Sequence, residues 1–361
     1  MRTRVYAAYD DGLRVVDPET GAVDERLADR AVECLSIAPG AERSDGARPA
    51  AAGARVLAGT FDAGLFRSVD DGEMFDRVAA ETLGPGGSGP DAVTAVATSP
   101  HDPSVVWIGT EPSRIYRSTD GGETAEPIAG PTDVPSASEW SFPPRPDTHH
   151  VRCIEPCPAD PARWFVGVEA GALLVASDGG ETWVDRPDGS RRDNHALATH
   201  PDAPDRVYAA AGDGFAESRD RGRTWRVVDR GLAHGYVWGI AVDPGDPETV
   251  LVSAASGANA AHRRGEAYLY RRTTDRTDGD QAGGGPSEEP RFERLDDRGM
   301  PTGAGTFRAV LASGRAAGEV WALSDAGLYR TADAGESFER VPAELPARPA
   351  RALAVGGGWA I

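Results

Sequence analysis

A short motif that recurs along the chain constrains its fold more than any other feature of the sequence. In each clear copy an Asp is followed two residues later by a Gly, and a Ser or Thr lies one or two residues before the Asp. The clear copies are Ser68–Phe75, Ser118–Thr124, Ser177–Trp183, Ser218–Trp225 and Thr331–Phe338. An Asp carboxylate accepts backbone N–H groups in a tight turn, and Gly supplies a positive φ there. We therefore predict that each copy is a β-hairpin turn and that its Asp is structural.

Two degenerate copies complete the series and set its period. Val15–Gly21 lies where a first copy is expected, and Thr273–Asp275 begins another. The motif aspartates, which lie 42 to 58 residues apart, are Asp17, Asp70, Asp120, Asp178, Asp220, Asp275 and Asp333. This spacing is typical of the blades of a β-propeller, in which each repeat supplies one four-stranded sheet. The seven copies predict an all-β chain that folds as a seven-bladed propeller.

The two ends of the sequence are predicted to share one blade. The residues from Arg4 to Tyr9 have the pattern of the second strand of a blade, so blade 1 lacks its innermost strand. The segment Arg351–Val355 has the pattern of that missing strand, and its pairing would close the ring and remove an open sheet edge. We expect residues 1–361 to form a single domain, with a polar insertion at 276–290 within blade 6.

The repeated motif resembles the Asp-box, S-x-D-x-G-x-T-W, and the resemblance covers nearly the whole chain. By this resemblance the chain is similar to the BNR-like repeat propellers, a group also labelled WD40/YVTN/BNR-like. That group includes sialidases, other glycosidases, sortilin-type receptors and photosystem assembly factors, and its members often carry the label glycosyl hydrolase. The resemblance implies the fold, but it implies no single activity, because one fold hosts many functions.

The composition is acidic and free of lysine. The formal net charge is −19, and all the basic residues other than histidine are arginine, which resembles adaptation to a very salty cytoplasm. Such a surface repels nucleic acid and anionic membranes, so we expect neither as a partner. No apolar run approaches the roughly 18 residues of a membrane span, and the pattern of the first residues leads us to expect no signal peptide. We expect a cytoplasmic, monomeric protein, and the three cysteines, an odd count, argue against a disulfide framework.

Histidines and carboxylates gather on one predicted face. With the strands of a blade named A to D from the axis outward, the D-to-A and B-to-C loops open on a single face, here called the funnel face. Five of the seven histidines fall there, namely His149, His150, His195, His234 and His262. Tyr236 and the carboxylates Glu169, Asp193 and Asp213 also fall there. The loop 138–152, with its aromatic residues, prolines and Arg145, is predicted to capture a ligand.

An alignment of the predicted A strands isolates one variable position at the mouth of the funnel. The strands share an aliphatic core position, and a small residue precedes it in every blade. Two residues before the core position stand Glu33, Thr94, Arg152, His195, Trp238, Arg308 and Arg351. The demands of the scaffold do not explain such variety, whereas a ligand site does.

Three chemistries are open for this face. A divalent metal could be held by His149 or His150, His195 and His234 with Glu169 or Asp193, because imidazole and carboxylate suit Zn, Mn or Fe. An anion could be bound by Arg152, Arg308 and Arg351. This trio is similar to the arginine triad of sialidases, but those have six blades and an Arg-Ile-Pro segment that this sequence lacks.

Hydrolysis is the third chemistry. Glycoside hydrolysis needs two carboxyl groups about 5–10 Å apart, and Glu169, Asp193 and Asp213 come from adjacent blades. We therefore expect a glycosyl-hydrolase-like or small-ligand-binding propeller with a His/Arg/carboxylate site and a small-molecule or carbohydrate ligand. The alternative is a non-catalytic scaffold or assembly factor with a protein partner.

Overall fold

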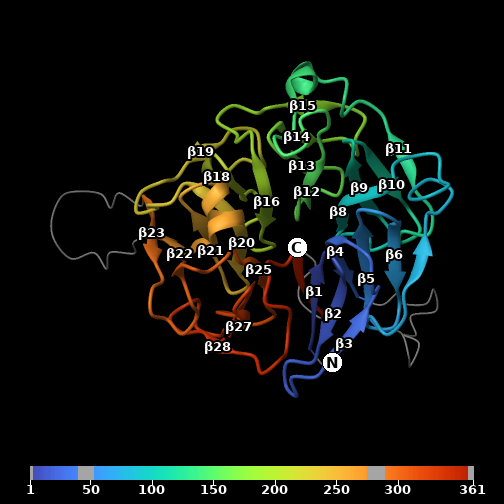
Figure 1. The fold of residues 1–361 in the computed structure, drawn as a ribbon. Coiled ribbons are helices and arrows are strands. Elements are labelled where there is room, and N and C mark those ends of the chain that lie inside the picture. The colour runs from blue at the N-terminus through green and yellow to red at the C-terminus, as the bar shows by residue number, and fades with distance from the viewer. Residues whose placement is uncertain (1–2, 40–52, 275–288, 357–361) are drawn as a thin grey trace.

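Seven antiparallel sheets stand in a ring around a central axis in the computed structural model (Figure 1). The structure describes residues 3–39, 53–274 and 289–356. Within these ranges six sheets have four strands, and the sheet of blade 6 has β24 (Gly303–Ala304) as a fifth. The prediction of an all-β, seven-bladed propeller is confirmed.

The strands of blades 1 to 7 follow in that order. The A strands are β29 (Ala352–Gly356), β4 (Val32–Ala38), β8 (Ala92–Thr98), β12 (Val151–Pro156), β16 (Asn194–Thr199), β20 (Tyr236–Asp243) and β25 (Val310–Ser313). The B strands are β1 (Arg4–Tyr9), β5 (Arg55–Thr60), β9 (Val106–Glu111), β13 (Trp164–Val168), β17 (Val207–Ala211), β21 (Asp246–Ala255) and β26 (Val320–Ser324). The C strands are β2 (Gly12–Val16), β6 (Gly64–Ser68), β10 (Ile115–Ser118), β14 (Ala172–Ala176), β18 (Gly214–Ser218), β22 (Glu266–Thr274) and β27 (Gly327–Thr331). The D strands are β3 (Val23–Arg26), β7 (Asp76–Val78), β11 (Glu126–Ile128), β15 (Trp183–Asp185), β19 (Arg226–Val227), β23 (Pro290–Arg294) and β28 (Glu339–Arg340).

The first and last strands share blade 1, as the sequence predicts. Strand β29 pairs antiparallel with β1, with Val355 opposite Val5, so the ring closes through the terminal strands. Residues 276–288 of the insertion predicted at 276–290 lie outside the described residues, and so does Asp275. Pro290, the last residue of the predicted insertion, is instead the first residue of β23. None of the helices in the described ranges has the length and hydropathy that crossing a membrane requires.

The middle strands of blade 4 are apolar along their whole length because the neighbouring blades cover both faces of its sheet. Every residue of β13 and β14 is buried. Between blades 3 and 4 the rings of Trp107 and Trp164 stack with their centroids 4.6 Å apart. The D strands, at the rim, are short and largely exposed. Burial is therefore concentrated in the inner strands, and exposure is concentrated at the rim.

The repeated motif forms the turn between strands C and D. In the copy of blade 5, Ser218 Oγ donates to Asp220 Oδ1 (2.8 Å), and the Thr224 N–H donates to the same oxygen (2.9 Å). The Gly222 N–H donates to Ser218 Oγ (2.8 Å). Gly222 has a φ of +77°, and a Cβ there would lie 2.5 Å from the Phe165 ring of blade 4. The turn therefore joins adjacent blades, and its Asp has a structural role.

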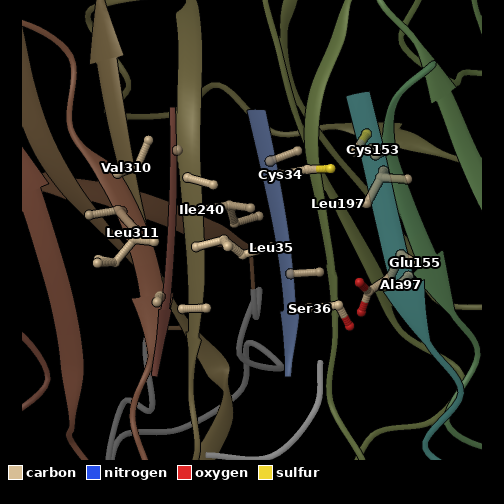
Figure 2. Close-up of a pocket in the computed structure, with 18 of the residues that line it drawn as sticks. Cys34, Leu35, Ser36, Ala97, Cys153, Glu155, Leu197, Ile240, Val310 and Leu311 are labelled. Atoms are coloured by element: carbon tan, nitrogen blue, oxygen red, sulfur yellow. The ribbon is translucent and has the colours of Figure 1, made fainter. Parts of the chain in front are cut away.

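A narrow channel of about 280 Å³ runs along the axis. Its wall contains the aligned aliphatic residues Leu35, Val96, Ile154, Leu197, Ile240, Val310 and Leu353. Figure 2 shows several of these side chains on neighbouring A strands, with Ser36 and Glu155 as polar exceptions. The core position of the A strands thus faces the axis, and the residues before it lead to the funnel mouth.

Candidate functional site

In five A strands a β-bulge falls on the variable position at the funnel mouth. The register with strand B skips one residue there, so this residue has no partner opposite it. The bulged residues are Glu33, Thr94, Arg152, His195 and Trp238. A bulge bends the strand and redirects a side chain, and bulges are common beside binding sites. In the other two blades Arg308 and Arg351 lie just before β25 and β29.

A cavity of about 680 Å³ lies over this mouth and shares lining residues with the axial channel. Its volume is in the range of small-molecule sites, about 300–1,000 Å³. The D-to-A loops supply residues such as Arg145 and Asp193, and the B-to-C loops supply Glu169 and His262. The structure therefore brings loops from the predicted funnel face together around one space.

Arg308 and Arg152 both lie over the indole of Trp238. Their guanidinium carbons are 4.0 and 4.9 Å from its ring centroid. Arg308 is buried, and its Nε and Nη1 donate to His262 Nδ1 and the Ala350 carbonyl, each at 3.0 Å. Among the described residues no carboxylate lies within ion-pair distance of it. Burial lowers the pKa of Arg308 to about 9, and the positive charge of Arg152 adds to this effect.

The other two arginines of the trio have acidic neighbours at longer distances. Arg152 Nε lies 3.5 Å from Glu169 Oε2, and Arg351 Nε lies 3.7 Å from Glu33 Oε1. All three arginines line the cavity. The cavity thus holds more positive charge than its own carboxylates neutralise at close range.

His262 supports Arg308 from a single turn of π-helix, Ala260–Arg264, in the B-to-C loop of blade 6. Because an arginine can only donate, the His262 Nδ1 that accepts from Arg308 carries no proton. Its Nε2 lies 2.8 Å from the Tyr236 hydroxyl and therefore donates to it in the neutral ring. Burial and the charge of Arg308 lower the pKa of His262 to about 3, which keeps the ring neutral. Burial also raises the pKa of Tyr236.

Glu169 and Asp193 lie side by side at the blade 4 and blade 5 side of the cavity. Burial alone would raise the pKa of Glu169, but the hydrogen bond from His150 (2.9 Å) and the charge of Arg152 lower it to about 2. Burial raises the pKa of Asp193, and the Glu169 carboxylate adds to the increase. The two carboxyl groups are therefore shifted in opposite directions.

The fully buried ring of His195 lies between these carboxylates. Its Nε2 is 3.9 Å from Glu169 Oε1 and 3.7 Å from Asp193 Oδ2. Its other nitrogen, Nδ1, is 2.7 Å from the Val237 carbonyl oxygen. Burial lowers the pKa of His195. In the described part of the chain, Glu169, Asp193 and His195 are the group of His, Cys, Asp and Glu side chains whose arrangement could hold a metal ion.

Three predicted site residues point elsewhere. The ring of His149 packs edge-on against Trp140, and that of His234 stacks on Tyr268 with centroids 4.1 Å apart. Asp213 accepts from the Arg192 N–H (3.3 Å) and does not line the cavity. The metal set that includes His149 or His234 is therefore not brought together, and Asp213 is not grouped with the other two carboxylates.

Sequence reasoning did not select Glu111 and Phe61, which also line the cavity. Glu111 accepts from Arg145 Nε (2.8 Å), and the Arg145 guanidinium lies over the rings of Phe61 and Phe142. Glu111 is the last residue of strand B in blade 3, and it occupies the position that Glu169 occupies in blade 4. An alignment of the B strands, like that of the A strands, could have identified it.

No family model matches the sequence, and no curated protein matches it. Solved propellers share the fold. A GH74 enzyme from Niastella koreensis superposes with a TM-score of 0.62 at 16% identity over 92% of this chain and 50% of its own. An ancestral GH74 enzyme gives 0.56 at 14% identity over 90% of this chain and 37% of its own. YCF48 from Cyanidioschyzon merolae gives 0.55 at 14% identity over 91% and 95%.

This chain therefore spans half or less of the length of the two GH74 enzymes and nearly all of YCF48. A structure of YCF48 bound to D1 peptide is similar as well, with a TM-score of 0.52 at 16% identity over 80% of this chain and 79% of its own. At these identities the likeness shows the propeller fold alone.

Proposed function

We propose that this chain is an Asp-box repeat propeller that binds a small anionic ligand in its funnel cavity. The observation that carries the proposal is the burial of Arg308 without a carboxylate partner in the described ranges. A buried charge without a counter-charge costs several kcal/mol. A carboxylate or phosphate ligand beside Arg308 would supply that counter-charge.

The neighbours of Arg308 narrow the class of ligand. Arg152 and Arg351 add positive charge on the same cavity, and guanidinium groups bind carboxylate and phosphate with two parallel hydrogen bonds. The indole of Trp238 lies against the guanidinium groups of Arg308 and Arg152, so it holds two of these cations at the cavity. A sugar acid, a sugar phosphate or a small hydroxy acid fits these features and the volume of about 680 Å³.

Titration with anions tests this proposal. Gluconate, glucuronate, citrate and glucose 6-phosphate would be added in molar KCl, and melting temperature and tryptophan fluorescence would be recorded. We expect at least one of them to raise the melting temperature of the wild type, and Arg308→Gln to abolish the effect. Arg294→Gln is a matched control, because Arg294 lies 4.9 Å over Tyr268 and does not line the cavity. An anion effect that persists in Arg308→Gln would refute the proposed site.

Hydrolysis of a glycoside is a second candidate, favoured by the opposite pKa shifts of Glu169 and Asp193. Such a pair suits a general acid beside an ionised carboxylate. Turnover of aryl glycosides tests this candidate directly. Loss of turnover in both Glu169→Gln and Asp193→Asn, with turnover retained in Asp213→Asn, would support it. Equal turnover in all variants would reject it.

A protein or peptide partner is the remaining alternative, and the fold shared with YCF48 bound to D1 peptide supports it. A scaffold uses a broad surface, so single substitutions in the cavity, such as Arg308→Gln, should leave partner binding almost unchanged. Failure of every anion to shift the melting temperature would turn the search to such partners.

A further inference from the structure

Glu169, Asp193 and His195 lie together at one side of the cavity. In each side chain one polar atom forms a hydrogen bond with the protein, and a second polar atom faces the other two side chains. In His195 the hydrogen-bonded atom is Nδ1, which lies 2.7 Å from the Val237 carbonyl oxygen. A carbonyl can only accept, so Nδ1 carries the proton and Nε2 of the neutral ring presents a lone pair. Nε2 is buried and has no hydrogen-bond partner among the described residues.

The two carboxylates divide their oxygens in the same way. Glu169 Oε2 accepts from His150 Nε2 at 2.9 Å, while Oε1 faces His195 Nε2 at 3.9 Å. Asp193 Oδ1 accepts from the Ala170 N–H at 2.9 Å, while Oδ2 faces the same nitrogen at 3.7 Å. Each carboxylate is thus oriented by one oxygen and leaves the other directed at His195.

The distances between the three directed atoms suit an ion in the middle and do not suit direct hydrogen bonds. All three atoms lie within 4.8 Å of one another, whereas hydrogen bonds of this kind need about 2.7–3.2 Å. Bonds of about 2.0–2.2 Å to one metal ion place its ligand atoms roughly 3–4 Å apart. Side-chain movements of less than about 1 Å would bring this set to that spacing.

We infer that Glu169, Asp193 and His195 bind one divalent transition-metal ion at the side of the funnel cavity. One imidazole and two carboxylates suit Zn, Mn or Fe, and the two negative charges match a divalent cation. His150 and the Ala170 N–H donate to the two carboxylates, and His195 donates to the Val237 carbonyl. Hydrogen bonds of this kind orient the ligands of metal sites. The inference goes beyond anion binding and does not depend on it, because Arg308 is not part of this set.

Three protein ligands would leave coordination positions for water or for an oxygen of the bound ligand. Glu169 and Asp193 both line the cavity, so the metal would be reached from the space that Arg152 and Arg308 also line. Sites with an open position use the ion to polarise a ligand oxygen or to activate water. A chelating hydroxy acid, which offers a hydroxyl beside a carboxylate, would satisfy both the ion and the arginines.

The alternative is a doubly protonated His195 that serves as the cation between two carboxylates. It predicts no metal uptake at this place. It also predicts that any binding of divalent ions comes from the acidic surface, whose formal net charge is −19, and is therefore insensitive to these three residues.

Metal titration in the absence of any other ligand separates these possibilities. The full chain would be treated with a chelator, dialysed into molar KCl and titrated with ZnCl2 or MnCl2 by calorimetry. We expect one site, and we expect Asp193→Asn and His195→Gln to lower its affinity by at least about tenfold, since even groups that only hydrogen-bond to a metal ligand contribute roughly 10–100-fold. Asp213→Asn is the matched control, because this carboxylate of blade 5 accepts from the Arg192 N–H and does not line the cavity.

A titration with Co2+ followed by visible absorption gives a second measurement. Co2+ bound to surface carboxylates would give a spectrum that does not depend on Asp193. We expect ligand-field bands that Asp193→Asn alters and Asp213→Asn preserves. Wild type that takes up no ion, or Asp193→Asn and His195→Gln that bind like wild type, would overturn the inference. Because Arg308→Gln should bind the metal normally, failure of the anion site and failure of the metal site remain distinguishable.

Discussion

The guanidinium carbon of Arg308 lies 4.0 Å from the ring centroid of Trp238, so this buried cation faces an aromatic ring and not a carboxylate. Arg272 in blade 6 also lies over an aromatic ring, that of Tyr208, at 5.5 Å from its centroid. It is also fully buried, but its Nη2 donates to Glu217 at 2.5 Å. A cation–π contact stabilises a desolvated cation by roughly 2 kcal/mol, which is less than the free-energy cost of burying the charge. The two arginines should therefore respond differently to neutralisation.

Arg308→Gln is expected to leave the ligand-free protein as stable as wild type or more stable, because it removes a buried charge that lacks a counter-charge. Arg272→Gln should cost about 3 kcal/mol, because it removes the buried guanidinium that donates to Glu217 Oε2 and to Glu248, while Arg226 and Arg219 keep only Glu217 Oε1 paired. Chemical denaturation of both variants checks the contrast. A loss of stability in Arg308→Gln as large as that in Arg272→Gln would mean that Arg308 serves the scaffold.

Glu155 should make the protein less stable at alkaline pH. It is buried beside the axial channel, and burial raises its pKa to about 8 although Thr199 donates to it. Unfolding returns the pKa to about 4.3, so between these values the folded state holds a proton that the unfolded state releases. The stabilising contribution is present at low pH and is lost as the pH rises through 8. Denaturation curves on either side of that pH should differ by about 1–3 kcal/mol in wild type and by clearly less in Glu155→Gln.

The blades were predictable from the sequence because their signals are local. Ser218, Asp220 and Thr224 bond to one another within a single turn, so the motif alone specifies the geometry. The funnel mouth was predictable for a related reason, since the A strands repeat one register and the bulge falls at one position in five of them. Local pattern and strand register thus placed Arg152, His195 and Trp238.

The contacts inside the site were not predictable, because they depend on side chains from different blades. His234 falls in the loop before β20, on the same predicted face as His195 of β16, but its ring stacks on Tyr268 of β22. Asp213 is held by a backbone N–H of the loop before blade 5. That no carboxylate of the described residues lies within ion-pair distance of Arg308 can be seen only when the surrounding strands are in place.

Asp220→Ala is expected to weaken the fold without affecting the cavity. Its carboxylate accepts from the N–H and the hydroxyl of Thr224 at 2.9 and 2.7 Å, and hydrogen bonds to charged groups contribute about 1.5–3 kcal/mol. We expect the free energy of unfolding to fall by about 1–3 kcal/mol while the response to anions stays at the wild-type level. A change in anion affinity in Asp220→Ala, with the fold intact by circular dichroism, would contradict a purely structural role.

Gly212→Ala is expected to disable the metal site through Asp193. A Cβ at residue 212 would lie 2.0 Å from Asp193 Oδ2, so the carboxylate must leave its present position, in which Oδ2 lies 3.7 Å from His195 Nε2. Gly235→Ala is the matched control, because no atom lies within 4 Å of its added Cβ and neither glycine has a φ in the left-handed range. Calorimetric titration with ZnCl2 should show about a tenfold loss of affinity for Gly212→Ala and none for Gly235→Ala. Metal binding by Gly212→Ala at the wild-type affinity would show that Asp193 Oδ2 is not a ligand, and that the room beside it serves only the packing of blades 4 and 5.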